Sequence, residues 1–547
     1  MVDRRRSWWG WGWEDQTPDA RQTAAIAATI ASRFDVPELA IREPIALRAL
    51  DLPDPRLVPP TALASMCSTD RYDRAGHTHG KSYRDIVRNF RGELAFAPDV
   101  VAKPRDEADV IALLEWCSAV GAAAIPYGGG SSVAGGVEAD IGDGYSGAVS
   151  IDLTNLDRVL EIDRVSRAAR IQGGALGPVL EQQLRPEGLT LRHFPQSFEF
   201  STLGGWLATR SGGHYASVYT HIDDLTESMR VVTPSGISES RRLPGSGAGP
   251  SPDRMFLGSE GTLGIITEAW MRLQDRPVHR SSAGVWFPSF GQGVEAVRVI
   301  SQSALFPTNC RLLDPGEASS SAGATGGAAV LVLGFESAHH PVDHWLASAL
   351  EICAVHGGTL PEPARSSSIA QTTTSKPSEA SAGAVETWRN AFLRAPYGRD
   401  ALVAMSVIAE TFETACTWDR FDELHAGVTE AVTNAMQEIC GGGTITCRFT
   451  HIYPDGPAPY FSVIAPSRWG SELSQWAEIK AAASDALITH GGTITHHHSV
   501  GRDHRPWYDQ QRPDVFASGL QSLKATLDPA AVLNPGVLFE PSRGSRT

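Results

Sequence analysis

Residues 126–136 read PYGGGSSVAGG, so that three consecutive glycines and two serines directly follow a short apolar run. Glycine adopts positive φ and lets backbone N–H groups approach a ligand closely, which is how loops cradle a diphosphate. The stretch matches neither GxGxxG nor GxxxxGK(S/T), because Val133 stands where the first pattern needs Gly or Ala and no lysine follows. A plain glycine-rich turn is the alternative explanation for this stretch by itself.

Two similar segments follow further along the chain. They are QSFEFSTLGGWLATRSGG at Gln196–Gly213 and LGSEGTLGIIT at Leu257–Thr267, and both combine glycines with hydroxyl side chains. Helix capping is an alternative role for these hydroxyls, since Ser201 precedes the helical run Leu203–Ala208. Three such segments in this order form a much more specific signal than any one of them.

Helix and strand patterns alternate around these segments. Asp106 can cap a helix whose apolar residues recur at i, i+3, i+4 and i+7 and which ends at Gly121, and Ala122–Pro126 behind it is typical of a buried strand. Further strands are expected at Ala148–Leu153, Ala168–Gln172, Met229–Thr233 and Gly264–Leu273, with a helix at Gly177–Leu184. Residues 93–278 are therefore predicted to form a mixed α+β domain.

The remaining chain is predicted to form three parts. Residues 1–92 are expected to be a helical extension, anchored by tryptophans near its start. Residues 279–469 are expected to be a second α+β domain, interrupted by a surface loop over Glu362–Gly383, which is rich in Ser, Thr, Ala and Pro. Residues 470–547 begin with an amphipathic helix that ends at Gly491–Gly492.

The composition argues against several classes of protein. The 547 residues carry 47 Lys and Arg against 62 Asp and Glu, a net charge of −15 with only 20% charged residues, which disfavours nucleic-acid binders and disordered proteins. Seven cysteines without CxxC spacing indicate a reducing, cytoplasmic compartment. No apolar core of a secretion signal follows Arg4–Arg6, and no apolar stretch is long enough to span a membrane, although a peripheral membrane contact stays open.

Together the three glycine-rich segments resemble the FAD-binding domain of the vanillyl-alcohol oxidase/para-cresol methylhydroxylase (VAO/PCMH) superfamily. The resemblance implies an α+β fold with a two-subdomain PCMH-type FAD-binding domain, an α+β cap domain with an antiparallel sheet for the substrate, and helical N- and C-terminal segments. It also implies FAD, which we expect to be bound non-covalently; Cys67, His77 and His79 are the alternative attachment points. The implied cofactor-binding residues are Pro126, Tyr127, Gly128, Gly129, Gly130, Ser131, Ser132, Gln196, Ser197, Phe198, Glu199, Phe200, Ser201, Thr202, Thr209, Arg210, Ser211, Gly212, Glu260, Gly261, Thr262, Leu263, Gly264, Ile265 and Ile266.

Within this superfamily the chain is most similar to the alkyldihydroxyacetonephosphate synthase family, the flavoenzymes of ether-lipid synthesis. The matching segments are WGWGWED (Trp9–Asp15), DRYDRAGHTHG (Asp70–Gly80), CRLLD (Cys310–Asp314), RDAL (Arg399–Leu402), ETFETACTWDR (Glu410–Arg420), IYPDGPAPYF (Ile452–Phe461) and GGTITHHHSVG (Gly491–Gly501). The resemblance implies that a long-chain fatty alcohol replaces the acyl chain of acyl-dihydroxyacetone phosphate through a flavin N5 adduct, without net electron transfer. It further implies an apolar tunnel in the second domain and is compatible with a homodimer.

Three adjacent histidines, His496, His497 and His498, follow a short strand predicted over Thr493–Thr495. Neighbouring side chains on an extended backbone point to opposite faces, so at most His496 and His498 can share a metal, and no third Cys, Asp or Glu ligand stands nearby. We therefore predict no metal site. Because imidazole titrates near neutrality, acid–base chemistry or substrate contact at the flavin is favoured over a polar surface turn.

Three further residues match functional positions of the family. Tyr460 matches its active-site tyrosine, although a core tyrosine is the alternative; a phenol of pKa ≈ 10 exchanges protons near neutrality only if a nearby cation or buried partner lowers that value. Arg399 and Arg311 match its substrate-side arginines, whose planar fork suits a phosphate. Ion pairs with Asp400 and Asp314 are the alternative roles of the two arginines.

The C-terminal tail favours a different reaction. Its segment KATLDPAAVLNPG (Lys524–Gly536) is similar to the tail of FAD-linked 2-hydroxyacid oxidases and dehydrogenases, which act on lactate, glycolate or 2-hydroxyglutarate. A flavin-binding protein without catalytic activity is the third hypothesis, because a fold alone does not fix a function.

Overall fold

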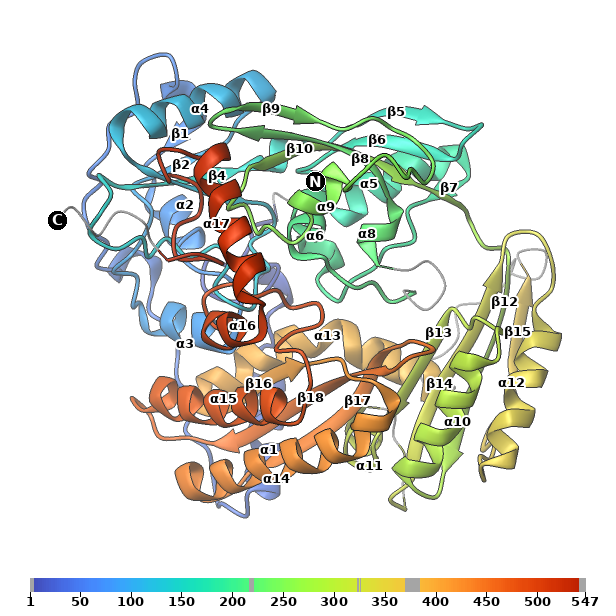
Figure 1. Ribbon diagram of the computed structural model, residues 1–547. Helices are drawn as coiled ribbons and strands as arrows, with labels where there is room; N and C mark the ends of the chain where they lie inside the picture. The colour runs from blue at the N-terminus through green and yellow to red at the C-terminus, as the bar shows by residue number, and fades with distance from the viewer. Residues whose placement is uncertain (1–3, 216–220, 322–323, 325, 369–383, 541–547) are drawn as a thin grey trace.

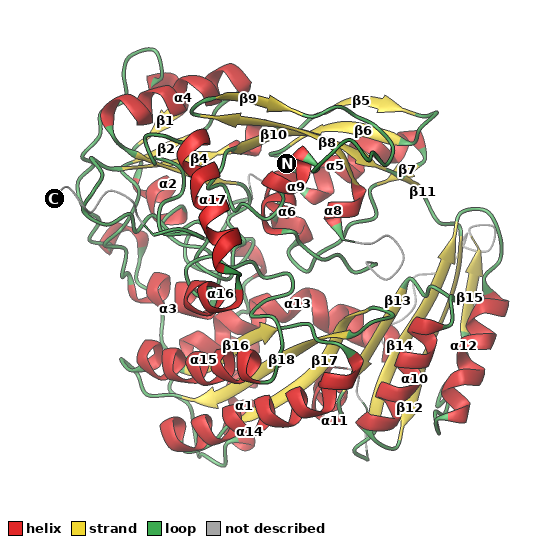
Figure 2. Cartoon of the chain, in the orientation of Figure 1, coloured by secondary structure: helices red, strands yellow, loops and turns green. Residues whose placement is uncertain are grey.

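Sheets of four, five and seven strands organise the α+β fold, which confirms the predicted fold class (Figures 1 and 2). The computed structural model describes residues 4–215, 221–321, 324, 326–368 and 384–540. In Figure 1 the two smaller sheets lie in the upper half of the molecule and the seven-stranded sheet lies in the lower half. Among the described residues, no helix combines the length and the apolar character that crossing a membrane requires.

The four-stranded sheet carries the first glycine-rich loop. Its order is β1-β2-β4-β3, with parallel pairing of β2 and β3 to the central β4. Asp106 caps α4 as predicted, because its side chain accepts the N–H of Asp109, and the apolar face of α4 packs on β4. The elements are β1 (Cys67–Ser68), β2 (Val100–Ala102), α4 (Glu107–Val120), β3 (Ala123–Tyr127) and β4 (Ala148–Asp152).

The five-stranded sheet is antiparallel, in the order β5-β6-β10-β8-β9, and it carries the other two glycine-rich segments. The predicted strands and the helix over Gly177–Leu184 are all present. Thr202 caps α6, because its side chain accepts the N–H of Gly205; the capping position is therefore Thr202 rather than Ser201. The elements are β5 (Val159–Asp163), β6 (Ala168–Gln172), α5 (Gly177–Leu184), α6 (Leu203–Thr209), α8 (Ile222–Leu225), β8 (Thr226–Thr233), β9 (Gly236–Glu239), α9 (Pro252–Phe256) and β10 (Ile265–Arg272), with a separate pair β7 (Leu189–Thr190) and β11 (Gln274–Asp275).

The seven-stranded sheet is antiparallel, in the order β15-β12-β14-β13-β17-β18-β16. One correction concerns the predicted loop over Glu362–Gly383: its residues Arg365–Ser368 form the edge strand β15, and residues 369–383 lie outside the described residues. The elements are β12 (His279–Phe287), α10 (Phe290–Gln302), β13 (Asn309–Leu313), α11 (Pro315–Ser321), β14 (Ala329–Ser337), α12 (Asp343–Val355), β15 (Arg365–Ser368), α13 (Ala384–Ala404), β16 (Val407–Glu413), α14 (Phe421–Cys440), β17 (Thr444–Ile452) and β18 (Pro457–Pro466).

Both ends of the chain connect the upper and lower halves. The tryptophan-rich start is buried as predicted: Trp8 packs with Leu94, and the backbone N–H of Trp11 donates to Asp400 on α13. At the other end, Leu533 pairs in parallel with Ala124 on β3. These terminal elements are α1 (Ala20–Arg33), α2 (Arg71–Gly76), α3 (Tyr83–Arg91), α15 (Glu472–Thr489), α16 (Arg505–Gln511) and α17 (Asp514–Leu527).

Candidate active site

A cavity of about 220 Å³ lies where the glycine-rich loops meet the seven-stranded sheet. Its wall combines the loop after β3, the start of α6, strands β17 and β18, and two histidines of the triplet, His497 and His498, whereas His496 lies outside this wall. A second cavity of about 90 Å³ shares Gly128, Thr202 and Thr209 with the first and extends toward β10. The first cavity therefore lies between the glycine-rich loops and the large sheet, and the second is lined by the glycine-rich segments and Ser499.

The glycine loop is packed so closely that side chains are sterically excluded. A Cβ on Gly129 would lie 1.6 Å from the carbonyl oxygen of Phe200, and one on Gly128 would lie 2.3 Å from Oγ1 of Thr202. Gly130 has φ +66°, which L-residues rarely adopt. Bare backbone beside serine and threonine hydroxyls is the donor set that a dinucleotide diphosphate requires, so these residues fit FAD.

Most of the predicted cofactor residues line one of these two cavities. Those on the first are Gly128, Gly129, Gly130, Ser131, Ser132, Gln196, Ser197, Ser201, Thr202, Thr209, Ser211 and Gly212. Those found only on the second are Pro126, Tyr127, Glu260, Gly261, Gly264, Ile265 and Ile266. Cys67, His77 and His79, the alternative attachment points for the flavin, lie outside both linings.

Six predicted cofactor residues lie elsewhere. Phe198, Glu199 and Phe200 form a short 3-10 helix in which Phe200 packs against Trp11 and Glu199 accepts the indole N–H of Trp13. Arg210, Thr262 and Leu263 line a separate cavity of about 790 Å³ beside the C-terminal helices. Direct cofactor contact by these six residues stays a prediction.

The register of the large sheet brings three polar side chains into one row. Tyr460 on β18 stands opposite Glu413 on β16 and opposite Arg448 on β17. Directly opposite residues share a face of the sheet, so the three side chains point toward the same side. Arg311 follows the same periodicity on β13, because Leu313, two residues on, pairs with Arg448. Of these four, Arg311, Arg448 and Tyr460 line the 220 Å³ cavity.

A β-bulge adds a fifth residue to this face. The pairing of β17 with β18 shifts between Phe449 and His451, so that His451 stands opposite Ala458. Ala458 and Tyr460 share a face because they are two residues apart, and the bulge therefore turns His451 toward the cavity. Bulges of this kind re-aim single side chains beside active sites.

Tyr460 lies close to one guanidinium group and two imidazole rings. The guanidinium of Arg448 lies 4.0 Å from the centre of its ring, and the rings of His497 and His498 lie 6.2 and 5.4 Å away. Burial raises the pKa of Tyr460 above its ordinary value, and Arg448 offsets this only in part. The cationic neighbour required by the sequence argument is present, but it does not lower the pKa overall, so the phenol is protonated at neutral pH and can donate a hydrogen bond.

Glu413 organises the histidine triplet from the buried side of the loop. Its carboxylate accepts the backbone N–H of His496 at 2.6 Å, of His497 at 3.1 Å and of His498 at 2.9 Å, together with the hydroxyl of Thr495 at 2.6 Å. The strand predicted over Thr493–Thr495 does not form: the N–H of Thr493 donates to the carbonyl of Ala415 and that of Ile494 donates to the side chain of Gln511. Sequence reasoning missed the role of Glu413, since it lies far from the triplet in the chain.

The histidines of the triplet are neutral bases. Burial lowers the pKa of His496 to about 4, and burial also lowers the pKa of His497 and His498, more than the nearby Glu413 raises them. Burial alone would raise the pKa of Glu413, but that pKa is held well below its usual value, and the hydrogen bond from Thr495 is one of the causes. Each imidazole is therefore neutral at neutral pH and keeps one nitrogen lone pair.

Both predicted arginines line the cavity. Arg311 is 3% exposed, and its burial, with Arg448 beside it, lowers the pKa of its guanidinium to about 9. Arg399 reaches the cavity from α13. The acids that follow them have other contacts: Asp314 accepts the N–H groups of Glu317 and Cys447, and Asp400 accepts that of Trp11. The two guanidinium groups thus face the space where an anionic substrate can bind.

Glu413→Gln is expected to lower the catalytic rate about 100-fold while FAD remains bound. An amide offers one acceptor oxygen to four donors, and each buried donor left unpaired costs about 1–3 kcal/mol, enough to displace the histidines. Steady-state kinetics together with the flavin absorption spectrum would measure both effects.

Glu410→Gln is the matched control for this variant. Glu410 lies on the same strand but on its other face, where it accepts hydrogen bonds from Trp476 and Lys480. This control should lower stability without changing the rate. Equal rate losses in the two variants would reduce the role of Glu413 to general stability.

Two family models match long stretches of this chain. Residues 98–239 match the family model described as "FAD binding domain", and residues 276–538 match "FAD linked oxidases, C-terminal domain". The alkyldihydroxyacetonephosphate synthase of Dictyostelium discoideum is 32% identical over 507 residues, which are 87% of this chain and 79% of that relative.

Comparison with solved structures also finds similarity to alkyldihydroxyacetonephosphate synthase. A structure of alkyldihydroxyacetonephosphate synthase superposes with a TM-score of 0.78 at 27% identity and covers 97% of this chain and 98% of its own. p-Cresol methylhydroxylase with substrate bound shares the fold, with a TM-score of 0.63 at 14% identity over 86% of this chain and 93% of its own. The predicted superfamily and the FAD cofactor are therefore confirmed.

Proposed function

This chain belongs to the alkyldihydroxyacetonephosphate synthase family, and from that membership we propose that it exchanges the acyl chain of acyl-dihydroxyacetone phosphate for a long-chain fatty alcohol. The ester bond at C1 breaks and releases a fatty acid, and the alcohol oxygen forms the ether bond to the same carbon, without net electron transfer. The observation that carries the proposal is the row of Arg448, Tyr460 and Glu413, which brings the phenol and two histidines of the triplet, His497 and His498, to the same cavity as the glycine loop.

FAD would be held by the residues of the two joined cavities. The loop Gly128–Ser132 would contact its diphosphate, and Ile265 and Ile266 would lie at its other end. When bound, FAD supplies the ring at which the substituents of C1 are exchanged. The positions of Cys67, His77 and His79 outside these cavities support a non-covalent complex.

The side chains around the cavity divide the proton transfers between them. Tyr460, protonated because burial raises its pKa, donates a proton to the departing carboxylate. His497 or His498, neutral because burial lowers the pKa of each, accepts the proton of the incoming alcohol and returns a proton to the phenolate of Tyr460, so that both groups regain their starting states. Arg311 and Arg399 hold the phosphate and carbonyl oxygens of the substrate, a task for which charged planar donors are suited.

The 790 Å³ cavity is a candidate compartment for an alkyl chain. Apolar side chains such as Met255, Leu520 and Leu523 line one wall, and the cavity shares Thr209 and Ser499 with the 220 Å³ cavity. Its lining comes from helices and loops of the FAD-binding part and from the C-terminal segment. We expected the tunnel in the second domain, but the compartment that we propose for the alkyl chain lies outside that domain.

Oxidation or reduction of a 2-hydroxyacid is the second candidate function. The observation that favours it is the match of residues 276–538 to the C-terminal domain of FAD-linked oxidases. Anaerobic mixing separates the candidates: the purified yellow protein is given D-2-hydroxyacids, or acyl-dihydroxyacetone phosphate with a fatty alcohol. Ether product without an electron acceptor supports the synthase, whereas rapid bleaching of the flavin by a hydroxyacid would overturn it.

Arg399→Lys is expected to raise the KM for acyl-dihydroxyacetone phosphate about tenfold with a smaller change in kcat. A lysine keeps the charge but loses the two-pronged contact that a guanidinium makes with a phosphate. Initial rates at varied substrate concentration measure the effect. Arg394→Lys, at an exposed position of the same helix, is the control; an unchanged KM in Arg399→Lys would remove Arg399 from substrate binding.

Four finer predictions accompany this proposal. The boundaries 1–92, 93–278, 279–469 and 470–547 follow the sequence patterns, and β1 of the N-terminal part pairs with β2 of the FAD-binding part. A homodimer and a peripheral membrane contact are proposed from the family resemblance. The cytoplasmic compartment is proposed from the cysteine pattern.

A further inference from the structure

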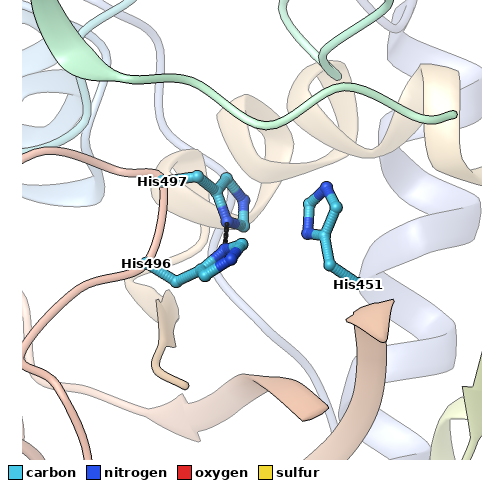
Figure 3. A group of neighbouring side chains, drawn as sticks. All are labelled: His451, His496 and His497. Atoms are coloured by element: carbon cyan, nitrogen blue, oxygen red, sulfur yellow. Dashed lines mark hydrogen bonds between the residues drawn. The ribbon is translucent and has the colours of Figure 1, made fainter. Parts of the chain in front are cut away.

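His451 meets two histidines of the triplet in the buried interior of the site (Figure 3). His451 comes from the end of β17, whereas His496 and His497 come from the loop that follows α15. Each ring offers one nitrogen, and the three nitrogens all lie within 4.8 Å of one another. Figure 3 shows the ring of His451 turned toward the space beside the other two.

The arrangement of the histidines differs from the one expected for an extended backbone. On an extended backbone only His496 and His498 could bind the same metal ion, and the sequence shows no third donor nearby. Because the carboxylate of Glu413 gathers the backbone N–H groups of the loop, His496 and His497 instead lie side by side, with their Nδ1 atoms 3.0 Å apart. The bulge in β17 supplies His451 as the third donor.

We propose that His451, His496 and His497 bind one divalent transition-metal ion of the zinc class, with water in the fourth position. Zinc binds imidazole nitrogens at 2.0–2.1 Å in tetrahedral geometry, which puts two ligand nitrogens about 3.4 Å apart. The Nδ1 atoms of His496 and His497 are 3.0 Å apart, and no two of the three ligand nitrogens are more than 4.8 Å apart. The spacing of about 3.4 Å lies between these two values, so small rotations of the rings complete the site. This proposal does not rest on the proposed reaction.

The three rings also contact groups other than the proposed ion, and these contacts favour metal binding. The Nε2–H of His451 donates to the carbonyl of Gly213 at 3.0 Å, and Nε2 of His496 lies 2.8 Å from the hydroxyl of Tyr453. A second hydrogen bond of this kind fixes the orientation of a metal-binding imidazole and raises its basicity. The carboxylate of Glu413, 3.4 Å from Nδ1 of His497, adds a buried negative charge beside the ion.

Metal occupancy should suppress any chemistry that uses the lone pair of His497. An ion bound to that nitrogen prevents it from accepting a proton. The site is therefore expected to be inhibitory in the exchange reaction, and a chelator should reverse the inhibition. Binding itself is measurable without turnover.

The test uses yellow holoprotein that has first been treated with a chelator. Zinc is titrated against a chromophoric chelator, and bound zinc is counted by elemental analysis after desalting. We expect one tightly bound ion per chain, and His451→Gln should weaken its affinity at least about tenfold, because loss of a group that merely hydrogen-bonds to a metal ligand already costs this much. Glutamine retains an N–H for the carbonyl of Gly213, and the flavin absorption reports whether the variant is folded.

Two further measurements complete the test. His344→Gln, at an exposed position on α12, controls for histidines elsewhere and should bind zinc as the unsubstituted protein does. If His451→Gln loses its flavin, the cobalt-loaded unsubstituted protein decides, since tetrahedral nitrogen ligation gives intense absorption bands beyond those of the flavin. Failure to take up zinc, equal affinity in His451→Gln, or a six-coordinate cobalt spectrum would overturn the proposal.

Discussion

Tyr460→Phe is expected to lower kcat for the exchange reaction about 1000-fold while FAD stays bound, because general acids typically contribute 10²–10⁴-fold. The phenol is 5% exposed and is protonated at neutral pH, since burial raises its pKa. Phenylalanine retains the ring that Arg448 covers at 4.0 Å, so packing is largely preserved and only the hydroxyl is lost. Single-turnover and steady-state rates, normalised to flavin content, measure the effect.

Tyr145→Phe is the matched control for that substitution. Tyr145 is also buried, and its hydroxyl donates to the carbonyl of Ala531 at a distance from both cavities. The control variant should lose about 1 kcal/mol of stability, the usual net value of one hydrogen bond, and keep its rate. A kcat for Tyr460→Phe within about threefold of the unsubstituted protein would remove Tyr460 from the proton transfers.

Gly129→Ala is expected to yield a folded but colourless protein that does not retain FAD. The added Cβ would lie 1.6 Å from the carbonyl oxygen of Phe200, a backbone atom that cannot move without displacing the short helix leading to α6. The loop must shift away, and its N–H groups then lose their positions around the diphosphate. The ratio of flavin to protein absorbance after incubation with excess FAD measures retention.

Gly76→Ala is the control for the glycine variant. Gly76 ends α2, and a Cβ at this position meets no heavy atom within 4 Å. This variant should bind FAD like the unsubstituted protein. Full flavin content in Gly129→Ala would mean that the loop tolerates a side chain, and its assignment to the diphosphate would then fail.

Local patterns predicted the secondary structure well. The capping aspartate and terminal glycine of α4, the exact span of α5, and the strands that became β4, β6, β8 and β10 all followed from residues close together in the chain. Such features depend on periodicity and on backbone requirements, which neighbouring residues fix. The errors occurred where a distant group replaced a local partner, as Ala415 and Gln511 did at residues 493 and 494 and β12 did at β15.

The glycine loops were also readable from the sequence, because the absence of side chains is itself the property that a bound dinucleotide requires. The roles of Glu413, Arg448 and His451 were not readable. Strand register sets Glu413 and Arg448 on either side of Tyr460, and one bulge turns His451 to the same face.

The sequence by itself therefore determined the elements, the superfamily and the cofactor-binding segments of this protein. Tertiary structure alone decided which titratable groups meet. A shift of one residue in strand pairing moves every side chain to the other face of the sheet, and no pattern confined to one strand records that pairing.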